Sequence, residues 1–185
     1  MRLRFFEKVA SSSERPPSPP AIGPSAPLSR RAGEATRKWL LLVEDNCYDE
    51  ALTMRAFRKN GFGSSVVVAR DGVEALSRVF GGDSDSAKEP PAETLPHLVL
   101  LDLQLPRLDG FEVLRRLRAR PRTRLVPVVI LSSSLEREDV ARSYELGANS
   151  YIRKPVDFAE FVVTASQLGD YWFGLNRTCP PPFGG

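Results

Sequence analysis

Short apolar segments divide the chain between residues 39 and 153, and polar residues follow each of them. Four of these segments are unbroken apolar runs: Trp39–Val43, Val66–Ala69, Leu98–Leu101 and Pro127–Leu131. Such runs are typical of strands that are buried on both faces, as central parallel strands are. We predict these four as strands and the shorter, mixed segment Asn149–Arg153 as a fifth.

Helical spacing of apolar residues follows each predicted strand. The spacing predicts helices at about 48–60, 72–80, 136–146 and 157–173, and an apolar helical stripe within 111–117. Gly61 and Gly147 stand where a glycine commonly ends a helix. Strands that alternate with helices imply right-handed crossovers and a parallel sheet covered on both faces. The predicted fold class is therefore α/β, a doubly wound parallel sheet.

The composition divides the chain into a domain and two tails. Residues 1–37 contain six prolines and no sustained period, so we expect a disordered tail. The domain should occupy residues 38–175, and residues 176–185 form a second tail rich in Pro and Gly. Within the domain, the polar segment 81–97 is typical of a long loop, and His97 at its edge is expected to be a surface residue.

Charge and cysteine content narrow the function classes. The formal net charge is +3, but residues 1–38 hold eight basic and three acidic residues, whereas the remainder holds 18 and 20. The domain is thus nearly neutral, which gives no support for nucleic-acid binding. The chain has neither a long apolar run nor a signal-like start, so we expect a cytoplasmic protein with no membrane segment. Cys47 and Cys179 are expected to be free thiols.

Chemically active residues stand at the ends of the predicted strands. Glu44 and Asp45 follow the first, Asp102 the third, Ser132 the fourth, and Lys154 follows the fifth. In open α/β sheets, ligands bind beyond the carboxyl ends of the strands. Three neighbouring carboxylates attract a cation, and oxygen ligands suit Mg²⁺. Together with a lysine and a hydroxyl group, such a site suits phosphoryl transfer onto a carboxylate.

Other interpretations of these residues are weaker. The acidic residues could form only the solvated rim of a loop, but their coincidence at several strand ends argues against this. Nucleotide-binding motifs of the forms G-x-G-x-x-G after the first strand and G-x-x-x-x-G-K-[ST] are absent from the sequence.

Four motifs together resemble the receiver domain of two-component response regulators. They are Leu-Leu-Val-Glu44-Asp45-Asn, Leu-Leu-Asp102-Leu-Gln-Leu-Pro106-x-x-Asp109-Gly110, Val-Val-Ile-Leu-Ser132-Ser and Gly147-Ala-x-x-Tyr151-Ile-Arg-Lys154-Pro155. The resemblance covers residues 39 to about 173. It implies a flavodoxin-like (βα)5 fold with strand order 2-1-3-4-5.

The resemblance also implies a role for each residue. Asp102 would be the phosphoacceptor, charged by a sensor histidine kinase or a phosphotransfer protein. Mg²⁺ would be held by Glu44, Asp45, Asp102 and the backbone carbonyl of Gln104. Ser132 and Lys154 would contact the phosphoryl group, and Ser132 and Tyr151 would form the switch. The protein would catalyse only its own phosphorylation and dephosphorylation.

A narrower resemblance points to the small regulators that pair with phytochrome histidine kinases. It rests on the long loop before the third strand, the Ile-Leu-Ser-Ser segment and the final Tyr171-Trp172-Phe173. It implies a bacteriophytochrome as one candidate partner. It also implies a possible homodimer through the helix after Ser134, the fifth strand and the last helix. The alternative for the three aromatic residues is packing of the helix end on the core.

Three functions remain to be distinguished at this stage. The first is a single-domain response regulator that signals by a phosphorylation-dependent change in protein–protein contacts. The second is an interaction scaffold that has the receiver fold but does not switch. The third is an aspartyl-phosphate phosphatase, which usually needs a second acid where this chain has Gln104.

Overall fold

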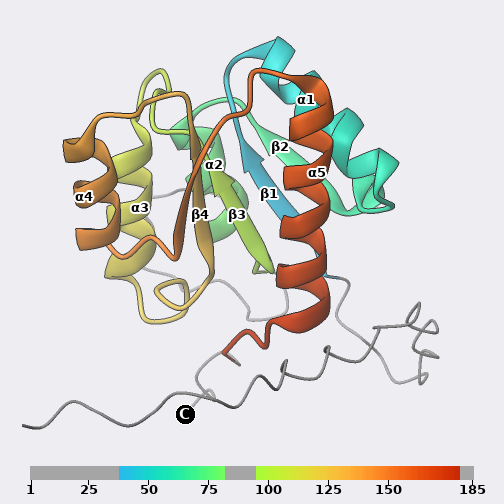
Figure 1. Cartoon of the computed structure of the whole chain (residues 1–185). Helices are drawn as coiled ribbons and strands as arrows, with labels where there is room; N and C mark the ends of the chain where they lie inside the picture. The colour runs from blue at the N-terminus through green and yellow to red at the C-terminus, as the bar shows by residue number, and fades with distance from the viewer. Residues whose placement is uncertain (1–37, 82–94, 180–185) are drawn as a thin grey trace, which may run out of the picture. The chain divides into compact units, whose positions relative to one another are not determined.

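A parallel sheet of five strands forms the centre of the protein (Figure 1). The structure is a computed structural model, and it describes residues 38–81 and 95–179. The strands are β1 (Leu40–Val43), β2 (Val66–Ala69), β3 (Leu98–Leu101), β4 (Val128–Ser132) and β5 (Ser150–Arg153). They pair in the order β2-β1-β3-β4-β5, and every pair is parallel. The predicted flavodoxin-like sheet is confirmed.

The strand register aligns the carboxyl ends of the central strands. Val43, the last residue of β1, lies opposite Ala69 of β2 and Leu101 of β3. On the other side of β3, Leu101 lies opposite Ile130 of β4. The residues that follow β1 and β3 therefore leave the sheet side by side.

Helices cover both faces of the sheet. Their bounds are α1 (Cys47–Lys59), α2 (Gly72–Phe80), α3 (Gly110–Ala119), α4 (Arg137–Glu145) and α5 (Phe158–Gly169), with a 3-10 turn, η1 (Gly63–Ser65), before β2. As Figure 1 shows, α1 and α5 lie on one face, while α2, α3 and α4 lie on the other. Four of the helices begin at a residue whose side chain accepts a backbone N–H, as good N-caps do: Asn46, Asp71, Asp109 and Asp157.

The apolar runs supply both halves of the core. Alternate residues of a strand point to opposite faces, so Leu40 and Leu42 pack towards α1 and α5, where they meet Phe57. Leu41 and Val43 pack instead on the opposite face, in the cluster that α2 and α3 complete. Because both faces are covered, the central strands have no polar side, which explains their unbroken apolar sequence.

The Asp109-Gly110 pair fits a close approach between α3 and the end of β3. A Cβ atom on Gly110 would lie 2.2 Å from the carbonyl oxygen of Asp102 and 2.8 Å from the Cα atom of Leu103. Both of these are backbone atoms, so only glycine fits here without moving the chain that carries Asp102.

The last predicted helix is not α-helical to its end. The α-helix ends at Gly169, and the chain continues as a π-helix, η3 (Asp170–Leu175). Gly169 packs directly on Phe62, since a Cβ atom there would lie 2.1 Å from the Phe62 ring. The π-helical turn places Trp172 in the core and leaves Tyr171 half exposed. Core packing thus accounts for Trp172.

His97, expected at the surface without a partner, is only partly exposed and has a partner. Its ring is half-buried beside Phe173, with 5.3 Å between the ring centroids, and Nε2 lies 3.2 Å from the carbonyl oxygen of Trp172. The Lys38 ammonium donates to the carbonyl of Phe173 at 3.2 Å. These contacts hold η3 against the end of the sheet that is remote from Asp102.

The side chain of Arg118 on α3 joins the segments that enter β4 and β5. It donates to the carbonyl oxygens of Val126 and Gly147 at 2.9 and 2.8 Å, and to Oδ1 of Asn149 at 3.0 Å. Burial lowers the pKa of this guanidinium. The amino-terminal ends of both strands are therefore fastened to one side chain.

Several sequence expectations concern features other than the sheet. The tail 1–37, most of the predicted loop 81–97 and the last residues of the tail 176–185 lie outside the described residues. Cys47 and Cys179 are exposed free thiols, as expected. Within residues 38–81 and 95–179, no helix is long and apolar enough to cross a membrane.

Candidate functional site

Asp102 occupies the centre of the site, directly after β3. Its backbone N–H donates to the carbonyl of Val43 at 3.1 Å, which continues the pairing of β1 with β3 by one residue. Its side chain is almost fully buried, and Oδ1 accepts the backbone N–H of Gln104 at 3.3 Å. The carboxylate is thus held in a fixed orientation at the edge of the sheet.

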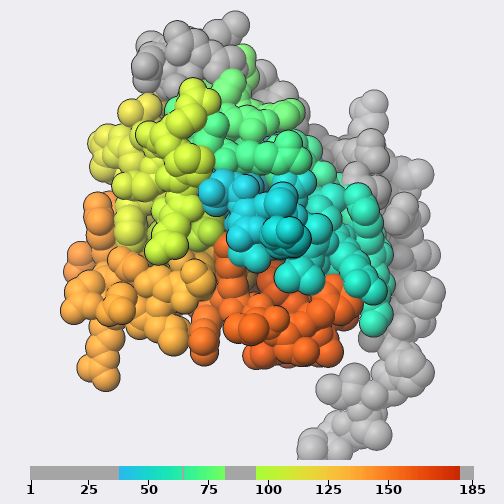
Figure 2. Space-filling view, turned by 90° about the horizontal axis from the view of Figure 1, so that it is seen from above, coloured from blue at the N-terminus to red at the C-terminus, as the bar shows by residue number. Residues whose placement is uncertain are grey.

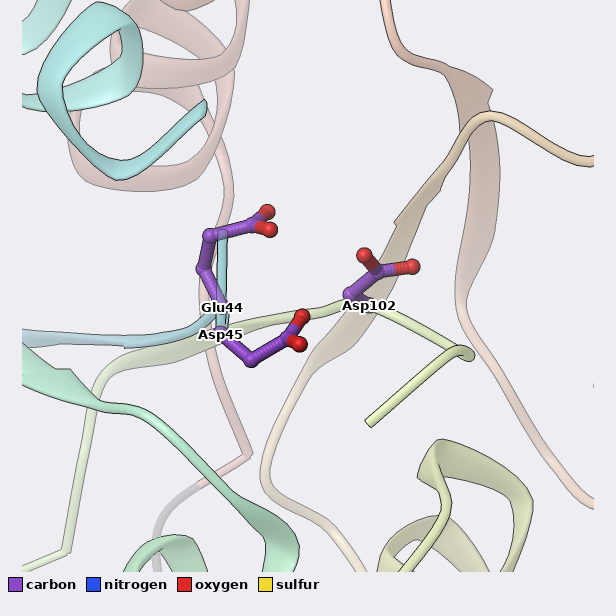
Figure 3. A group of neighbouring side chains, drawn as sticks. All are labelled: Glu44, Asp45 and Asp102. Carbon is purple, nitrogen blue, oxygen red and sulfur yellow. The ribbon is translucent and has the colours of Figure 1, made fainter. Parts of the chain in front are cut away.

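Glu44 and Asp45 approach Asp102 from the end of β1. Glu44 is 1% exposed, and its Oε1 accepts the backbone N–H of Asn46 at 3.2 Å. Asp45 is exposed to solvent. Figure 3 shows the carboxylates of Glu44 and Asp45 on the side that faces Asp102. One side chain of the group is therefore open to solvent while the other two are enclosed.

These three carboxylates form a cluster that could hold a metal ion. Each offers an oxygen atom, and the three atoms lie within 4.8 Å of one another. An all-oxygen, acidic set of ligands with one solvent-exposed member suits a hard divalent cation such as Mg²⁺, which keeps several waters. The residues present therefore fit the metal ion that the sequence predicted.

Lys154 reaches the same cluster from the end of β5. Its Nζ atom lies 2.6 Å from Oδ2 of Asp102, 2.7 Å from Oε2 of Glu44 and 3.0 Å from Oδ2 of Asp49. Its backbone N–H donates to the carbonyl of Ser132 at 2.8 Å, so β4 fixes its position. The lysine thus neutralises part of the acidic cluster.

Burial and charge shift the pKa values of this group in opposite ways. Burial raises the pKa of Glu44 to about 7, although the hydrogen bond from Lys154 acts against that shift. Burial alone would lower the pKa of Lys154, but hydrogen bonds to Asp102 and Glu44 raise it above its usual value. The lysine is therefore cationic at neutral pH, whereas burial disfavours the charged form of Glu44.

Ser132 and Tyr151 meet at the loop that follows β4. Ser132 is fully buried, and its hydroxyl oxygen accepts the backbone N–H of Ser134 at 3.3 Å. The Tyr151 hydroxyl donates to the carbonyl of Ser134 at 3.0 Å. The hydroxyl of Ser134 in turn donates to Oδ2 of Asp139 at 2.6 Å. One loop residue thus connects β4, β5 and α4.

The structure brings the predicted residues to one edge of the sheet, with one addition. Glu44, Asp45 and Asp102 lie together, and Lys154 contacts two of them. Sequence reasoning missed Asp49. An acidic residue in the first turn of a helix is usually explained by the helix dipole, so the sequence carries no distinct signal for it. The predicted metal-binding role of the Gln104 carbonyl stays a prediction.

The edge that carries the site is open to solvent at the start of α1. Figure 2 looks onto this edge and shows the start of α1 in blue, between the segment after β3 in yellow-green and α5 in orange. The residues that follow Glu44 are exposed, and Tyr48 is 78% exposed. The acidic cluster therefore meets solvent on the side of Asp45.

Solved structures and curated relatives resemble this chain closely. The probable methanogenesis regulatory protein FilR2 of Methanothrix harundinacea is 40% identical over 142 residues, which cover 77% of this chain and 88% of the relative. The phosphorylated cyanobacterial phytochrome response regulator RcpA has a TM-score of 0.67 at 33% identity, over 77% of this chain and 98% of its own.

A third relative was solved with a metal ion. The Mn²⁺-bound form of the response regulator Rcp1 has a TM-score of 0.65 at 29% identity, over 77% of this chain and 99% of its own. Rcp1 of Synechocystis is 32% identical to this chain over 135 residues, which cover 73% of this chain and 88% of the relative. Residues 40–166 match the family model of the response regulator receiver domain. The chain therefore belongs to the response regulator receiver domain family.

Proposed function

We propose that Asp102 accepts a phosphoryl group from a histidine kinase or a phosphotransfer protein, and that phosphorylation changes the protein's contacts with its partners. The observation that carries the proposal is the enclosed Asp102 carboxylate, bound by Lys154 at 2.6 Å and grouped with Glu44 and Asp45. RcpA, which the chain resembles over 77% of its length, was solved in a phosphorylated form.

In the proposed reaction, an Asp102 oxygen forms a bond to phosphorus while the bond from phosphorus to the donor imidazole nitrogen breaks. The imidazole leaves with the electron pair of that bond and takes a proton from solvent. The N–H of Gln104 holds the carboxylate in place, because it donates to Oδ1 at 3.3 Å. Positioned groups of this kind supply most of the catalysis in phosphoryl transfer.

The cation proposed for this site is Mg²⁺, held by Glu44, Asp45, Asp102 and the backbone carbonyl of Gln104. When bound, Mg²⁺ neutralises charge on the phosphoryl oxygens. Two observations support the cation: the carboxylate oxygens lie within 4.8 Å of one another, and the related Rcp1 was solved with Mn²⁺.

Ser132 and Lys154 are proposed to bind the phosphoryl group after transfer. Movement of Ser132 would carry the loop after β4 with it, because its hydroxyl oxygen accepts the Ser134 N–H. Tyr151 would follow, since its hydroxyl is bonded to Ser134. A switch of this type needs a few kcal/mol of difference between two states, which roughly two charge-assisted hydrogen bonds supply.

The face formed by α4, β5 and α5 is the proposed surface for a homodimer. Tyr144 of α4, Val163 of α5 and Tyr171 of the following η3 are each at least half exposed, and a hollow of about 350 Å³ lies between β5 and the end of α5. For the donor, a bacteriophytochrome is the proposed class of histidine kinase, because RcpA is a phytochrome response regulator. A cytoplasmic location is part of the same proposal.

Phosphorylation by a small-molecule donor tests the proposal. The full chain is incubated with acetyl phosphate and Mg²⁺, and its intact mass is measured. The unaltered chain should gain one phosphoryl group, and Asp102→Asn should gain none while its circular dichroism stays the same. Asp109→Asn is the matched control: Asp109 caps α3, and asparagine caps helices equally well.

The outcomes separate the competing functions. A phosphoryl group on Asp102→Asn would remove Asp102 from its role. If the unaltered chain takes up no phosphoryl group, the result would support the non-switching scaffold. Membership of the receiver family argues against that alternative. Repeated release of phosphate from a general substrate such as p-nitrophenyl phosphate would favour a phosphatase.

A further inference from the structure

The Lys154 ammonium is shared among three carboxylates, and one of them lies outside the acidic cluster of Glu44, Asp45 and Asp102. Glu44 and Asp102 are two of its partners, and Asp49 in the first turn of α1 is the third, at 3.0 Å. We infer that Asp49 is a positioning residue that retains the Lys154 ammonium at the site when Glu44 and Asp102 bind a metal ion. The inference rests on the proposed function of this site.

Lys154 has as many hydrogen-bond partners as its ammonium group can bind. An ammonium group has three N–H donors and no acceptor, so three carboxylate partners saturate it. The Lys154 side chain is only 9% exposed, and a buried cation without partners is costly. Each partner that it loses must therefore be replaced or the lysine must move.

A bound metal ion would compete with Lys154 for Glu44 and Asp102. Both belong to the carboxylate cluster whose oxygen atoms lie within 4.8 Å of one another, and both also accept from Lys154. Oxygen atoms that serve a metal ion are less available to the lysine. Asp49 lies outside that cluster, so it is the partner that Lys154 keeps.

The position of Asp49 makes it suitable for this role. Its side chain is about one-third exposed, so it carries a smaller desolvation cost than the enclosed Glu44. It stands on α1, whereas Lys154 follows β5, so the ion pair joins two separate elements that border the site. Without Asp49, Lys154 would hold Glu44 and Asp102 more strongly and oppose metal binding.

Metal titration of four proteins tests this coupling. Mn²⁺ binding is measured by calorimetry on the unphosphorylated full chain, on Asp49→Asn, on Lys154→Met and on the double variant. With Lys154 present, Asp49→Asn should weaken Mn²⁺ binding roughly fivefold or more. In the Lys154→Met background, the same change removes only a screened charge and should weaken binding roughly twofold or less. Equal factors in both backgrounds would overturn the inference.

Glu50 provides a matched control on the same helical turn. Glu50→Gln removes the same charge from the first turn of α1, but the partner of Glu50 is Arg70, at 2.8 Å. This variant should change Mn²⁺ affinity roughly twofold or less, as expected for a screened surface charge. If Glu50→Gln weakens binding as much as Asp49→Asn does, the effect comes from charge near the helix terminus and not from Lys154.

The lysine itself gives a second readout. With Mg²⁺ bound, the 15Nζ signal of Lys154, assigned by its loss in Lys154→Met, should stay protected from solvent exchange in the unaltered chain. Asp49→Asn should lose that protection, and Asp49→Glu should restore it. Unchanged protection in Asp49→Asn would overturn the inference. Neither readout uses a phosphoryl donor, so both stand apart from Asp102 phosphorylation. Absence of metal binding by the unaltered chain would overturn the proposed metal site and this inference together.

Discussion

The hydroxyl of Tyr151 donates a 3.0 Å hydrogen bond to the backbone carbonyl of Ser134, so a β5 side chain holds the loop that leaves β4. Ser134 also donates its own hydroxyl to Asp139 of α4. The aromatic ring packs against the α2 and α3 half of the core. A single tyrosine therefore connects the loop beside Ser132 with the interior of the protein.

Replacement of this tyrosine by phenylalanine should loosen the loop and leave the core intact. Tyr151→Phe keeps the ring but removes the hydrogen bond, so unfolding in urea should show a loss of about 1 kcal/mol. Hydrogen exchange of the amides at 133–136 should become faster. Tyr144→Phe, on an exposed ring of α4, is the control, and its stability should not change by more than about 0.5 kcal/mol. Unchanged exchange in Tyr151→Phe would show that the bond does not hold the loop.

A side chain at position 110 should disturb the end of β3. In Gly110→Ala, the new Cβ would meet backbone atoms of Asp102 and Leu103 at 2.2 and 2.8 Å. The expected loss is about 1–3 kcal/mol of unfolding free energy, as for other overpacked sites. Metal affinity should fall as well, because Asp102 is displaced. Gly174→Ala is the control, since a Cβ there has no atom within 4 Å. Equal stability of both variants would contradict the close approach.

Two buried threonines should respond oppositely to valine. Among the described residues, Oγ1 of Thr53 in α1 is buried without a hydrogen-bond partner. Thr53→Val should therefore keep or raise the unfolding free energy, by up to about 1 kcal/mol. Oγ1 of Thr123 donates to the carbonyl of Leu117 at 2.7 Å, so Thr123→Val should lose about 1–2 kcal/mol. Urea unfolding of both variants measures the difference, and equal losses would argue for a partner of Thr53.

The stability that Glu112 contributes should depend on pH. Hydrogen bonds from Arg115 and Arg116 lower the pKa of Glu112 to about 2. Because the pKa is lower in the folded state, ionised Glu112 stabilises that state at pH values above its ordinary pKa of 4.5. This stabilisation is lost as the pH falls towards 2. These side chains are partly exposed to solvent, which screens the ion pairs, so Glu112→Gln should cost less than about 1 kcal/mol at pH 7.

Unfolding in urea between pH 7 and pH 3 measures this dependence. The difference between the unaltered chain and Glu112→Gln should shrink as the pH falls below 4.5, the ordinary pKa of the carboxyl group. The double variant with Arg115→Gln and Arg116→Gln removes the same hydrogen bonds by changing the arginines and keeping Glu112. In that background, Glu112→Gln should have no pH-dependent effect. A constant difference across the range would contradict the cause given for the low pKa.

The α/β class and the meeting of the site residues could be predicted because both follow from local patterns, whereas the strand order was implied by the resemblance to receiver domains. Unbroken apolar runs marked the strands, and parallel strands bring their carboxyl ends to one edge. Glu44, Asp102 and Lys154 each come directly after a strand, so the prediction needed no detail of side-chain packing. Their contacts in the structure agree with that expectation.

The features that were missed depend on contacts between distant segments. Asp49 lies within a helix and meets Lys154 only because α1 starts beside the end of β5. The π-helical turn begins directly after Gly169, whose close packing on Phe62 joins it to a distant segment. His97 has a partner only because that turn brings the Trp172 carbonyl to it. Residue patterns along one segment carry no information about such pairs.

The three bonds from Arg118 fasten the outer half of the sheet at one of its two ends. Val126, Gly147 and Asn149 lie where β4 and β5 begin, whereas Ser132 and Lys154 lie where they finish. The contacts of Arg118 therefore leave Ser132 and Lys154, the two residues proposed to bind the phosphoryl group, at the ends of the strands that this side chain does not hold.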